Sequence, residues 1–268
     1  MKFYPEDTIF LEYNYLAKAG KPCLLFLNGL TQSFDAWNNT IAHLEKKFEI
    51  LLVDLINQGN SSKTEREIDF NEHAAIIHKL IKHLKINEVW IVGISYGSIV
   101  AQHYANLFPL SLKGLVLISS FAKKNNYYRA IEVAWKNSIE QMGYKYFLQT
   151  IFPFVLGKTY FEGAEFSIEK ILSERLSKPF NEKSLKLLMK ATEERKDFSE
   201  ELKSVKAPVL ILHGEEDTLF TVEMAQYLAQ TIPQSLLKIL PQTGHSINVE
   251  QPFLLARLVE EFIETKTT

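Results

Sequence analysis

The sequence predicts an α/β fold: a mostly parallel, doubly wound sheet with a helical lid inserted before the last two strands. Three observations support this prediction. Short apolar runs alternate with helical patterns up to about residue 122, strand-like runs nearly vanish over residues 123–203, and the alternation resumes after that. We therefore expect a core domain formed by residues 1–122 and 204–268, with residues 123–203 as a helical lid.

The expected strands are short and apolar throughout, which is typical of strands buried on both faces of a parallel sheet. An early strand over residues 8–15 alternates apolar and polar side chains instead, as in one half of an antiparallel pair. The apolar runs are residues 23–27, 50–54, 89–92, 115–118, 209–212 and 236–240.

Helical patterns separate these runs, and this order of strands and helices favours right-handed crossover connections. In the core, we expect helices over residues 71–84, 95–108, 221–230 and 252–262. In the inserted segment, we expect helices over residues 126–142, 144–152, 168–176 and 182–195. This segment is also rich in aromatic side chains.

Composition excludes several classes of protein. The chain has 268 residues, of which 46% are hydrophobic, and a formal net charge of −2, so it lacks the basic excess that nucleic-acid binding needs. No apolar run is long enough for a membrane span, and acidic residues and a proline stand where a signal peptide would be apolar. The lone Cys23 excludes an internal disulfide. We expect a cytoplasmic protein that needs no metal and no organic cofactor.

The segment Gly93-Ile94-Ser95-Tyr96-Gly97 has the pattern G-x-S-x-G and joins an expected strand to an expected helix. In that context the pattern predicts a nucleophile elbow, a tight turn that presents the serine hydroxyl at the carboxyl end of the sheet. A side chain at either glycine would collide with neighbouring backbone. The alternative is an ordinary strand-to-helix turn in which Ser95 caps the helix.

A serine needs an adjacent base to become a nucleophile, and His245 is the histidine whose place fits. It lies in a loop between the last expected strand and the last expected helix. In sheets of this kind, loops at the carboxyl ends of the strands carry the catalytic residues. Four of the other histidines lie on the expected helices over residues 71–84 and 95–108, and we expect a further helix to carry His43. His213 ends a strand as a core or rim residue. The alternative for His245 is a solvated loop residue.

The third residue of a triad should lie between the serine and the histidine in the chain. Asp217 stands just beyond an expected strand, and its carboxylate would hold the histidine tautomer. Glu215 and Glu216 compete for this role, and all three acids could simply solvate the turn.

An oxyanion hole needs two backbone N–H groups, which we assign to Tyr96 and to Leu30 in the loop after residues 23–27. Gly29 would let this loop approach closely. We expect Asn28 and Gly29 to contact substrate, together with two aromatic residues of the insertion, Trp135 and Phe147.

Residues 28–30, 93–97, 214–217 and 244–245 resemble the α/β-hydrolase superfamily, in its lid-bearing esterase and thioesterase-like branch, and the resemblance covers nearly the whole chain. Two features depart from it. Many relatives have histidine at the position of Asn28. Many also have a Gly-His-Gly turn after the aspartate that ends the strand, and in the residues after Asp54 only Gly59 and Ser61 match that pattern. A serine at position 95 argues against the haloalkane dehalogenase branch, which has aspartate there.

These residues predict a serine hydrolase that cleaves a small-molecule carboxylic ester or thioester with an apolar acyl group, through an acyl-enzyme intermediate. The insertion would act as a lid that shapes the acyl pocket, although many of its aromatic residues could simply pack together. Its basic residues form either a solvated face or a docking surface for an acyl-carrier protein, since the arrangement resembles methyl esterases that act on carrier-bound chains. Two alternatives are an acyltransferase that passes an acyl group from a carrier protein or CoA to an alcohol, and a non-catalytic binding protein.

Overall fold

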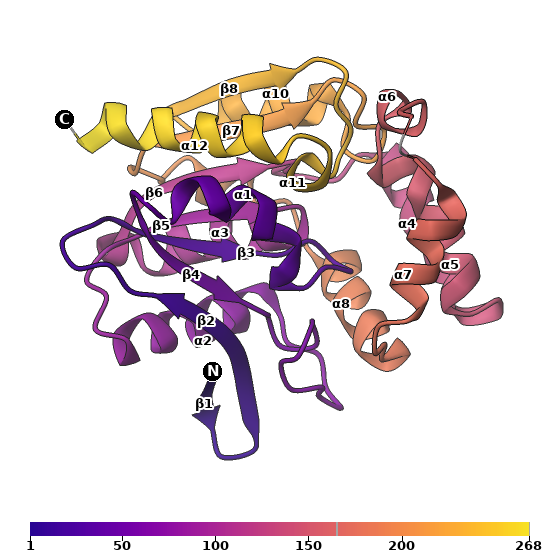
Figure 1. The fold of residues 1–268 in the computed structure, drawn as a ribbon, viewed down its shortest axis with the longest axis horizontal. Coiled ribbons are helices and arrows are strands. Elements are labelled where there is room, and N and C mark those ends of the chain that lie inside the picture. Colours follow the sequence, from indigo (N-terminus) through magenta and orange to yellow (C-terminus); the bar gives the residue numbers. More distant parts are fainter. Residues whose placement is uncertain (165, 268) are drawn as a thin grey trace.

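A computed structural model describes residues 1–164 and 166–267, and in these residues an eight-stranded sheet forms the centre of the molecule (Figure 1). The strand order is β1-β2-β4-β3-β5-β6-β7-β8. β2 pairs antiparallel with both β1 and β4, and all other neighbours are parallel, which confirms the predicted sheet. The strands are β1 (Lys2–Glu6), β2 (Ile9–Leu16), β3 (Cys23–Leu27), β4 (Glu49–Val53), β5 (Val89–Ile94), β6 (Leu112–Ile118), β7 (Val209–Gly214) and β8 (Ser235–Leu240).

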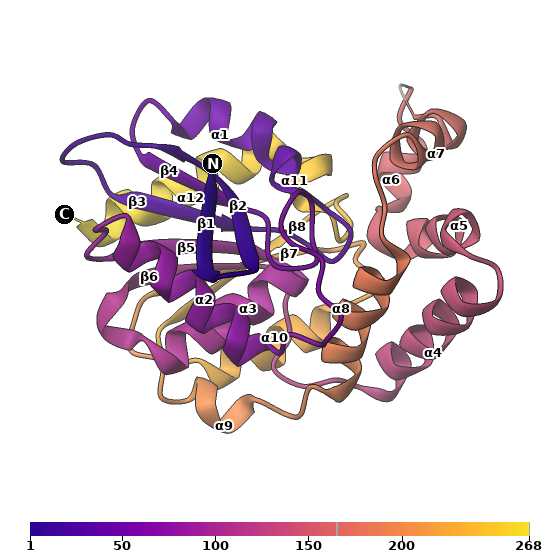
Figure 2. The ribbon, with the colours of Figure 1, turned by 90° about the horizontal axis from the view of Figure 1, so that it is seen from below.

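Helices cover both faces of the sheet, which explains why β3, β5 and β7 are buried at every position (Figure 2). One face packs against α2 (Phe70–His83), α3 (Tyr96–Leu107) and α10 (Val222–Thr231), and the other against α1 (Asn38–Leu44) and α12 (Pro252–Thr267). Four shorter helical segments complete the core: η1 (Phe34–Trp37), η2 (Pro109–Ser111), α9 (Ser199–Leu202) and α11 (Ile247–Glu250).

The helical insertion follows β6 and precedes β7, and therefore lies before the last two strands, as the sequence predicts. It contains α4 (Asn126–Gln141), α5 (Tyr144–Val155), α6 (Lys158–Phe161), α7 (Ile168–Leu176) and α8 (Glu182–Glu194). These helices lie beyond the carboxyl ends of the parallel strands (Figure 1). The α5 helix continues through Pro153 to Val155, one turn beyond the expected end, although a proline inside a helix removes one backbone hydrogen bond.

Within the described residues, no helix combines the length and the apolar composition that crossing a membrane requires.

A histidine buried between α2 and α3 makes stability depend on pH. His73 is 1% exposed, packs against the Tyr96 ring at 5.8 Å, and has no hydrogen-bond partner for either ring nitrogen among the described residues. Burial lowers the pKa of His73 to about 3. In the unfolded chain the pKa of this residue is about 6.5. At a pH between these two values, the unfolded chain therefore binds a proton at His73 and the native state does not.

We expect this residue to reduce the free energy of unfolding as pH falls below 6.5, by about 2 kcal/mol at pH 5 relative to pH 7. Urea unfolding at both pH values measures this loss. In His73→Leu, the decrease between pH 7 and pH 5 should be smaller by about 2 kcal/mol, because the leucine cannot take up the proton. The same pH dependence in both proteins would rule out this explanation.

Candidate active site

The serine of the G-x-S-x-G segment lies at a strained turn between β5 and α3. Ser95 has φ 51° and ψ −115°, a conformation that non-glycine residues rarely adopt. Its N–H donates to the Ile118 carbonyl of β6 at 2.9 Å. A Cβ atom at Gly93 would lie 2.5 Å from the Gly97 carbonyl oxygen, and one at Gly97 would lie 2.4 Å from the Leu27 carbonyl oxygen. The predicted collision with backbone is confirmed at both glycines.

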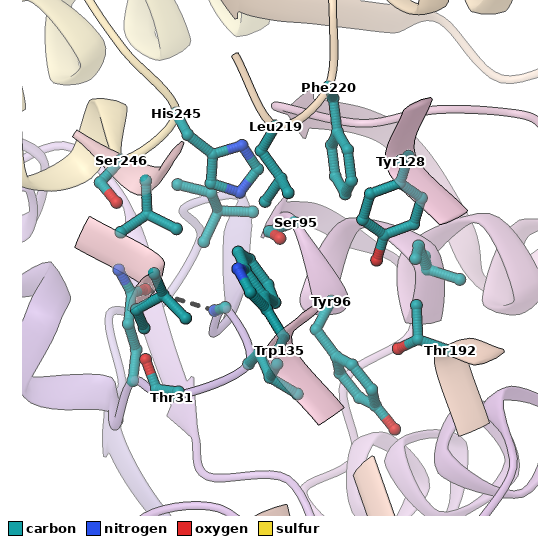
Figure 3. A pocket seen from close by; sticks show the side chains of 17 residues that line it. Thr31, Ser95, Tyr96, Tyr128, Trp135, Thr192, Leu219, Phe220, His245 and Ser246 are labelled. Carbon is teal, nitrogen blue, oxygen red and sulfur yellow. Dashed lines mark hydrogen bonds between the residues drawn. The ribbon is translucent and has the colours of Figure 1, made fainter. Parts of the chain in front are cut away.

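Ser95 opens into a cavity of about 70 Å³ between the sheet and the helical insertion (Figure 3). We call this space the catalytic cavity. His245 lines it, as do most of the other predicted site residues: Gly29, Leu30, Tyr96 and Trp135. Much of the remaining wall is apolar, including Ile94, Ile99, Ile151, Val155, Leu219 and Phe220.

His245 and Asp217 form a buried hydrogen bond beside this cavity. The distance from His245 Nδ1 to Asp217 Oδ2 is 2.8 Å, and the two side chains are 4% and 0% exposed. A carboxylate can only accept, so Nδ1 carries the proton and Nε2 keeps a free lone pair. The other oxygen, Oδ1, accepts the N–H groups of Leu219 at 3.0 Å and Phe220 at 2.9 Å.

Of the three candidate acids, Asp217 is the one that contacts His245. Glu215 is exposed to solvent. Glu216 instead accepts from the backbone N–H and the hydroxyl of Thr159 in the helical insertion, at 2.8 and 2.7 Å.

Two residues that the sequence does not reveal hold the loop of His245 in place. Ser119, at the end of β6, donates from its hydroxyl to the His245 carbonyl at 2.7 Å. Glu250 accepts the N–H groups on both sides of His245, from Gly244 at 2.7 Å and Ser246 at 3.2 Å. Burial raises the pKa of the Glu250 carboxyl group, and the backbone donors oppose that rise. These contacts join distant segments, so no local pattern signals them.

The structure places His213 in the core, fully buried, and not at the rim. Its Nε2 lies 2.8 Å from the Phe220 carbonyl, which can only accept, so Nε2 carries the proton. Burial lowers the pKa of His213 and favours the neutral ring. His213 thereby fixes Phe220, whose N–H binds Asp217 and whose ring lies 4.9 Å from that of His245, edge to face.

The two expected oxyanion donors both border the cavity. Leu30 lies in a turn that the Gln32 N–H closes on the Gly29 carbonyl, at 3.1 Å, while the Gln32 side chain accepts the Gly29 N–H at 3.2 Å. Tyr96 is the first residue of α3, so its N–H has no acceptor inside the helix.

The structure does not bring the side chains of Asn28 and Phe147 to the catalytic cavity, in contrast to the prediction. Asn28 is fully buried: its amide donates to Asp54 Oδ1 at 3.0 Å and accepts from Trp37 Nε1 at 2.9 Å. It therefore fastens the loop after β3 to the core. Phe147 is also fully buried and packs behind Trp135, with ring centroids 6.1 Å apart.

Among the described residues, no group of three or more His, Cys, Asp or Glu side chains is arranged to hold a metal ion.

Comparisons with known proteins agree with this architecture. A family described as alpha/beta hydrolase fold matches residues 22–252. The chain is 26% identical over 266 residues to 3-oxoadipate enol-lactonase 2 of Acinetobacter baylyi, with 96% of each chain covered. It is 23% identical over 272 residues to monoacylglycerol lipase ABHD6 of Homo sapiens, covering 94% of this chain and 78% of the relative.

Two solved structures are also similar. MGS-M2, an alpha/beta hydrolase enzyme from a Medee basin deep-sea metagenome library, has a TM-score of 0.89 and 25% identity, with 98% of this chain and 97% of that chain covered. A thermophilic esterase from Thermogutta terrifontis has a TM-score of 0.85 and 24% identity, covering 97% of this chain and 95% of the other.

The close approach at Gly97 makes a stability prediction. Gly97→Ala should lower the free energy of unfolding by about 3 kcal/mol, because the new methyl group meets rigid backbone of β3. Gly29→Ala is the matched control, since its methyl group would meet the flexible Gln32 side chain at 3.3 Å and should cost less than about 1 kcal/mol. Denaturant unfolding measures both values, and equal losses would refute the argument.

Proposed function

The chain belongs to the alpha/beta hydrolase fold family, and from this premise we propose that it is a serine esterase with Ser95, His245 and Asp217 as its catalytic triad. The observation that carries the proposal is the buried 2.8 Å hydrogen bond between His245 and Asp217, beside a cavity that His245 shares with the strained Ser95. This bond fixes the neutral imidazole in the tautomer whose Nε2 can take up a proton.

The proposed reaction has two halves. Ser95 Oγ attacks the ester carbonyl carbon while His245 Nε2 accepts the hydroxyl proton, and the backbone N–H groups of Leu30 and Tyr96 stabilise the oxyanion. Collapse of this intermediate breaks the ester bond, and His245 gives its proton to the departing alcohol. Water then attacks the acyl enzyme, with His245 again as base, and the carboxylic acid leaves. The Asp217 carboxylate stabilises the imidazolium that forms in each half.

The walls of the catalytic cavity support a short apolar acyl group. Aliphatic side chains from the sheet and the insertion surround Ser95, among them Ile99, Ile151 and Leu219. In this proposal residues 123–203 form the lid of the catalytic domain, and they limit the access of bulk solvent to the catalytic cavity. A lactone and an acylglycerol are both carboxylic esters, so the names of the relatives favour an oxygen ester over a thioester.

A fluorophosphonate probe should label Ser95, because such probes react with an activated serine hydroxyl. Ser95→Ala should abolish labelling and reduce the hydrolysis of p-nitrophenyl butyrate by roughly 10³-fold or more. Ser177→Ala, at an exposed serine of the insertion, is the control and should keep full activity. Peptide mass spectrometry locates the label, and a label on any other residue contradicts the assignment of the nucleophile.

Product analysis separates hydrolysis from acyl transfer. We expect free butyric acid without any added alcohol. Turnover that requires an alcohol and yields a new ester would replace this proposal with an acyltransferase.

Asp217→Asn should lower kcat by roughly 10³-fold or more with little change in KM. An asparagine amide can donate to Nδ1, which favours the tautomer whose Nε2 already carries a proton and cannot act as a base. Glu215→Gln removes a neighbouring carboxylate that is exposed, and it should leave kcat within a factor of about two. Similar losses in the two variants would mean that the negative charge of the turn matters and not the contact with His245.

A further inference from the structure

The expected oxyanion donor in the loop after β3 is a backbone group, so its direction depends on how one peptide group is held. The N–H of Leu30 and the carbonyl of Gly29 belong to the same peptide group, and the bond between them is trans. In a trans peptide the carbonyl and the N–H lie in one plane and point in opposite directions. A contact that fixes the Gly29 carbonyl therefore also fixes the direction of the Leu30 N–H.

This peptide group follows a glycine, which restrains it less than another residue would. Glycine adopts a wider range of backbone conformations than residues with a Cβ atom. The loop borders the catalytic cavity through Gly29, Leu30, Thr31 and Gln32. Rotation of the peptide group would turn the Leu30 N–H away from this cavity. A donor stabilises an oxyanion best when it is already held in place, so the peptide group needs support from its neighbours.

Two N–H groups hold the Gly29 carbonyl, and they come from different segments. Gln58 Nε2 donates to it at 3.0 Å, and the Gln32 backbone N–H donates to it at 3.1 Å. A carbonyl oxygen can only accept, so the Gln58 amide must present its nitrogen at this place. The Gln32 N–H belongs to the same turn as Gly29 and would move with it. Gln58 lies in the loop after β4, so its amide ties the turn to a separate part of the chain.

The fold brings Gln58 to this place and holds it there. The neighbouring strands β3 and β4 are parallel, so the loops that follow them begin at the same edge of the sheet. Gln58 is 3% exposed and lies behind the loop after β3, outside the wall of the catalytic cavity. Its N–H donates to the Leu55 carbonyl at 2.9 Å. Its carbonyl accepts the Ser61 N–H at 3.1 Å and Lys63 Nζ at 2.8 Å. The amide of Gln58 thus extends from a fixed backbone.

The peptide group on the other side of Gly29 is also held by a glutamine side chain. Gln32 Oε1 accepts the Gly29 N–H at 3.2 Å. The same oxygen accepts from Asn248 Nδ2 of α11, also at 3.2 Å. Asn248 lies three residues after His245, so Gln32 joins the loop after β3 to the histidine loop. With its N–H bound by Gln32 and its carbonyl bound by Gln58, Gly29 is restrained on both sides.

We propose that Gln58 is a positioning residue of the oxyanion hole: its amide holds the Gly29 carbonyl and thereby directs the Leu30 N–H at the developing oxyanion. This inference rests on the proposed esterase function, in which Leu30 is a donor. Among the described residues, the contact with Gly29 is the one hydrogen bond of the Gln58 side chain, and its Oε1 has no partner. A buried acceptor without a partner lowers stability, so an apolar side chain of this size would serve packing better.

Gln58→Met tests the inference, because methionine has nearly the same length and cannot donate. With p-nitrophenyl butyrate, kcat should fall by about tenfold or more, up to the roughly 10²–10³-fold loss that follows removal of an oxyanion donor. KM should stay within about twofold, since both halves of the reaction use the same donor. The midpoint of urea unfolding should stay close to that of the wild type, because the unpartnered Oε1 is lost together with the hydrogen bond.

Thr64→Val is the matched control, at a buried side chain that contacts the same loop. The Thr64 hydroxyl accepts from Asn57 Nδ2 at 3.0 Å and donates to the Arg66 carbonyl at 2.7 Å. Valine has the same shape and makes neither contact, so the midpoint of urea unfolding should fall. The value of kcat should stay within about twofold, because the contact between Gln58 and Gly29 remains. A purely structural role of Gln58 predicts the opposite order, with the larger loss of activity in the less stable variant.

Butylboronic acid reports on the oxyanion hole directly. Ser95 Oγ bonds to boron while the hydroxyl proton passes to His245, and the tetrahedral boronate resembles the transition state. The Ki of butylboronic acid should rise in Gln58→Met by about the factor by which kcat/KM falls. The Ki of butyramide, whose planar carbonyl resembles the ground state, should change by less than about threefold. Gln58→Leu should behave like Gln58→Met, and it takes its place if the methionine variant does not fold.

Several outcomes would overturn the inference while the esterase function stands. These are an unchanged kcat in both Gln58 variants, an equal loss of kcat in Thr64→Val, or a lower kcat without a weaker affinity for butylboronic acid. Hydrolysis of the ester by the wild type, with the probe on Ser95, shows in the same series that the esterase function holds. If the wild type neither hydrolyses the ester nor is labelled at Ser95, the proposed function itself fails, and the inference fails with it.

Discussion

The hydrogen bond between His245 and Asp217 is the constraint on which the rest of the site depends. Burying a carboxylate is costly unless hydrogen-bond donors surround it, and the two backbone N–H groups of residues 219 and 220 supply these together with the imidazole. That arrangement requires a fixed turn after β7, which His213 holds through the Phe220 carbonyl. It also requires a fixed histidine loop, which Ser119 and Glu250 hold from two other segments. The hydrogen bond between His245 and Asp217 therefore requires that the ends of β6 and β7 and the helix α11 all keep fixed positions.

The same contacts attach the helical insertion to the site. Glu250 accepts the Gly157 N–H of the insertion at 3.2 Å in addition to those of the histidine loop, and the Ser246 N–H donates to the Val155 carbonyl at 3.1 Å. At the base of the insertion, the buried Arg195 donates to the Ala122 carbonyl at 2.9 Å, which joins its two ends. Both attachments are made by buried or backbone groups, so they hold the helical insertion against the core.

Sequence patterns predict the elements that act locally and miss those that depend on distant partners. The G-x-S-x-G segment and the apolar strands are each recognised from a few consecutive residues. The chain order of serine, acid and histidine then limits where the other two residues of the triad can lie. The seven-residue helix α1 is too short to produce a clear periodicity. Asn28 stands in the expected loop, but the buried Asp54 and Trp37 decide where its amide points. Ser119 contacts a carbonyl 126 positions away, and no local signal marks it.

Helix α4 packs over the catalytic cavity with a stripe of buried side chains. Tyr128 and Trp135 are seven positions apart, on one stripe of the helix, and they border the catalytic cavity. Glu132 lies on the same stripe, four positions after Tyr128, and pairs with Lys124 at 3.0 Å. This stripe packs the helix against the core, so a change there would disturb the helical insertion as well as the catalytic cavity. The ion pair also joins α4 to α8, because Lys124 donates to the carbonyls of Thr192 and Glu193, both at 2.8 Å.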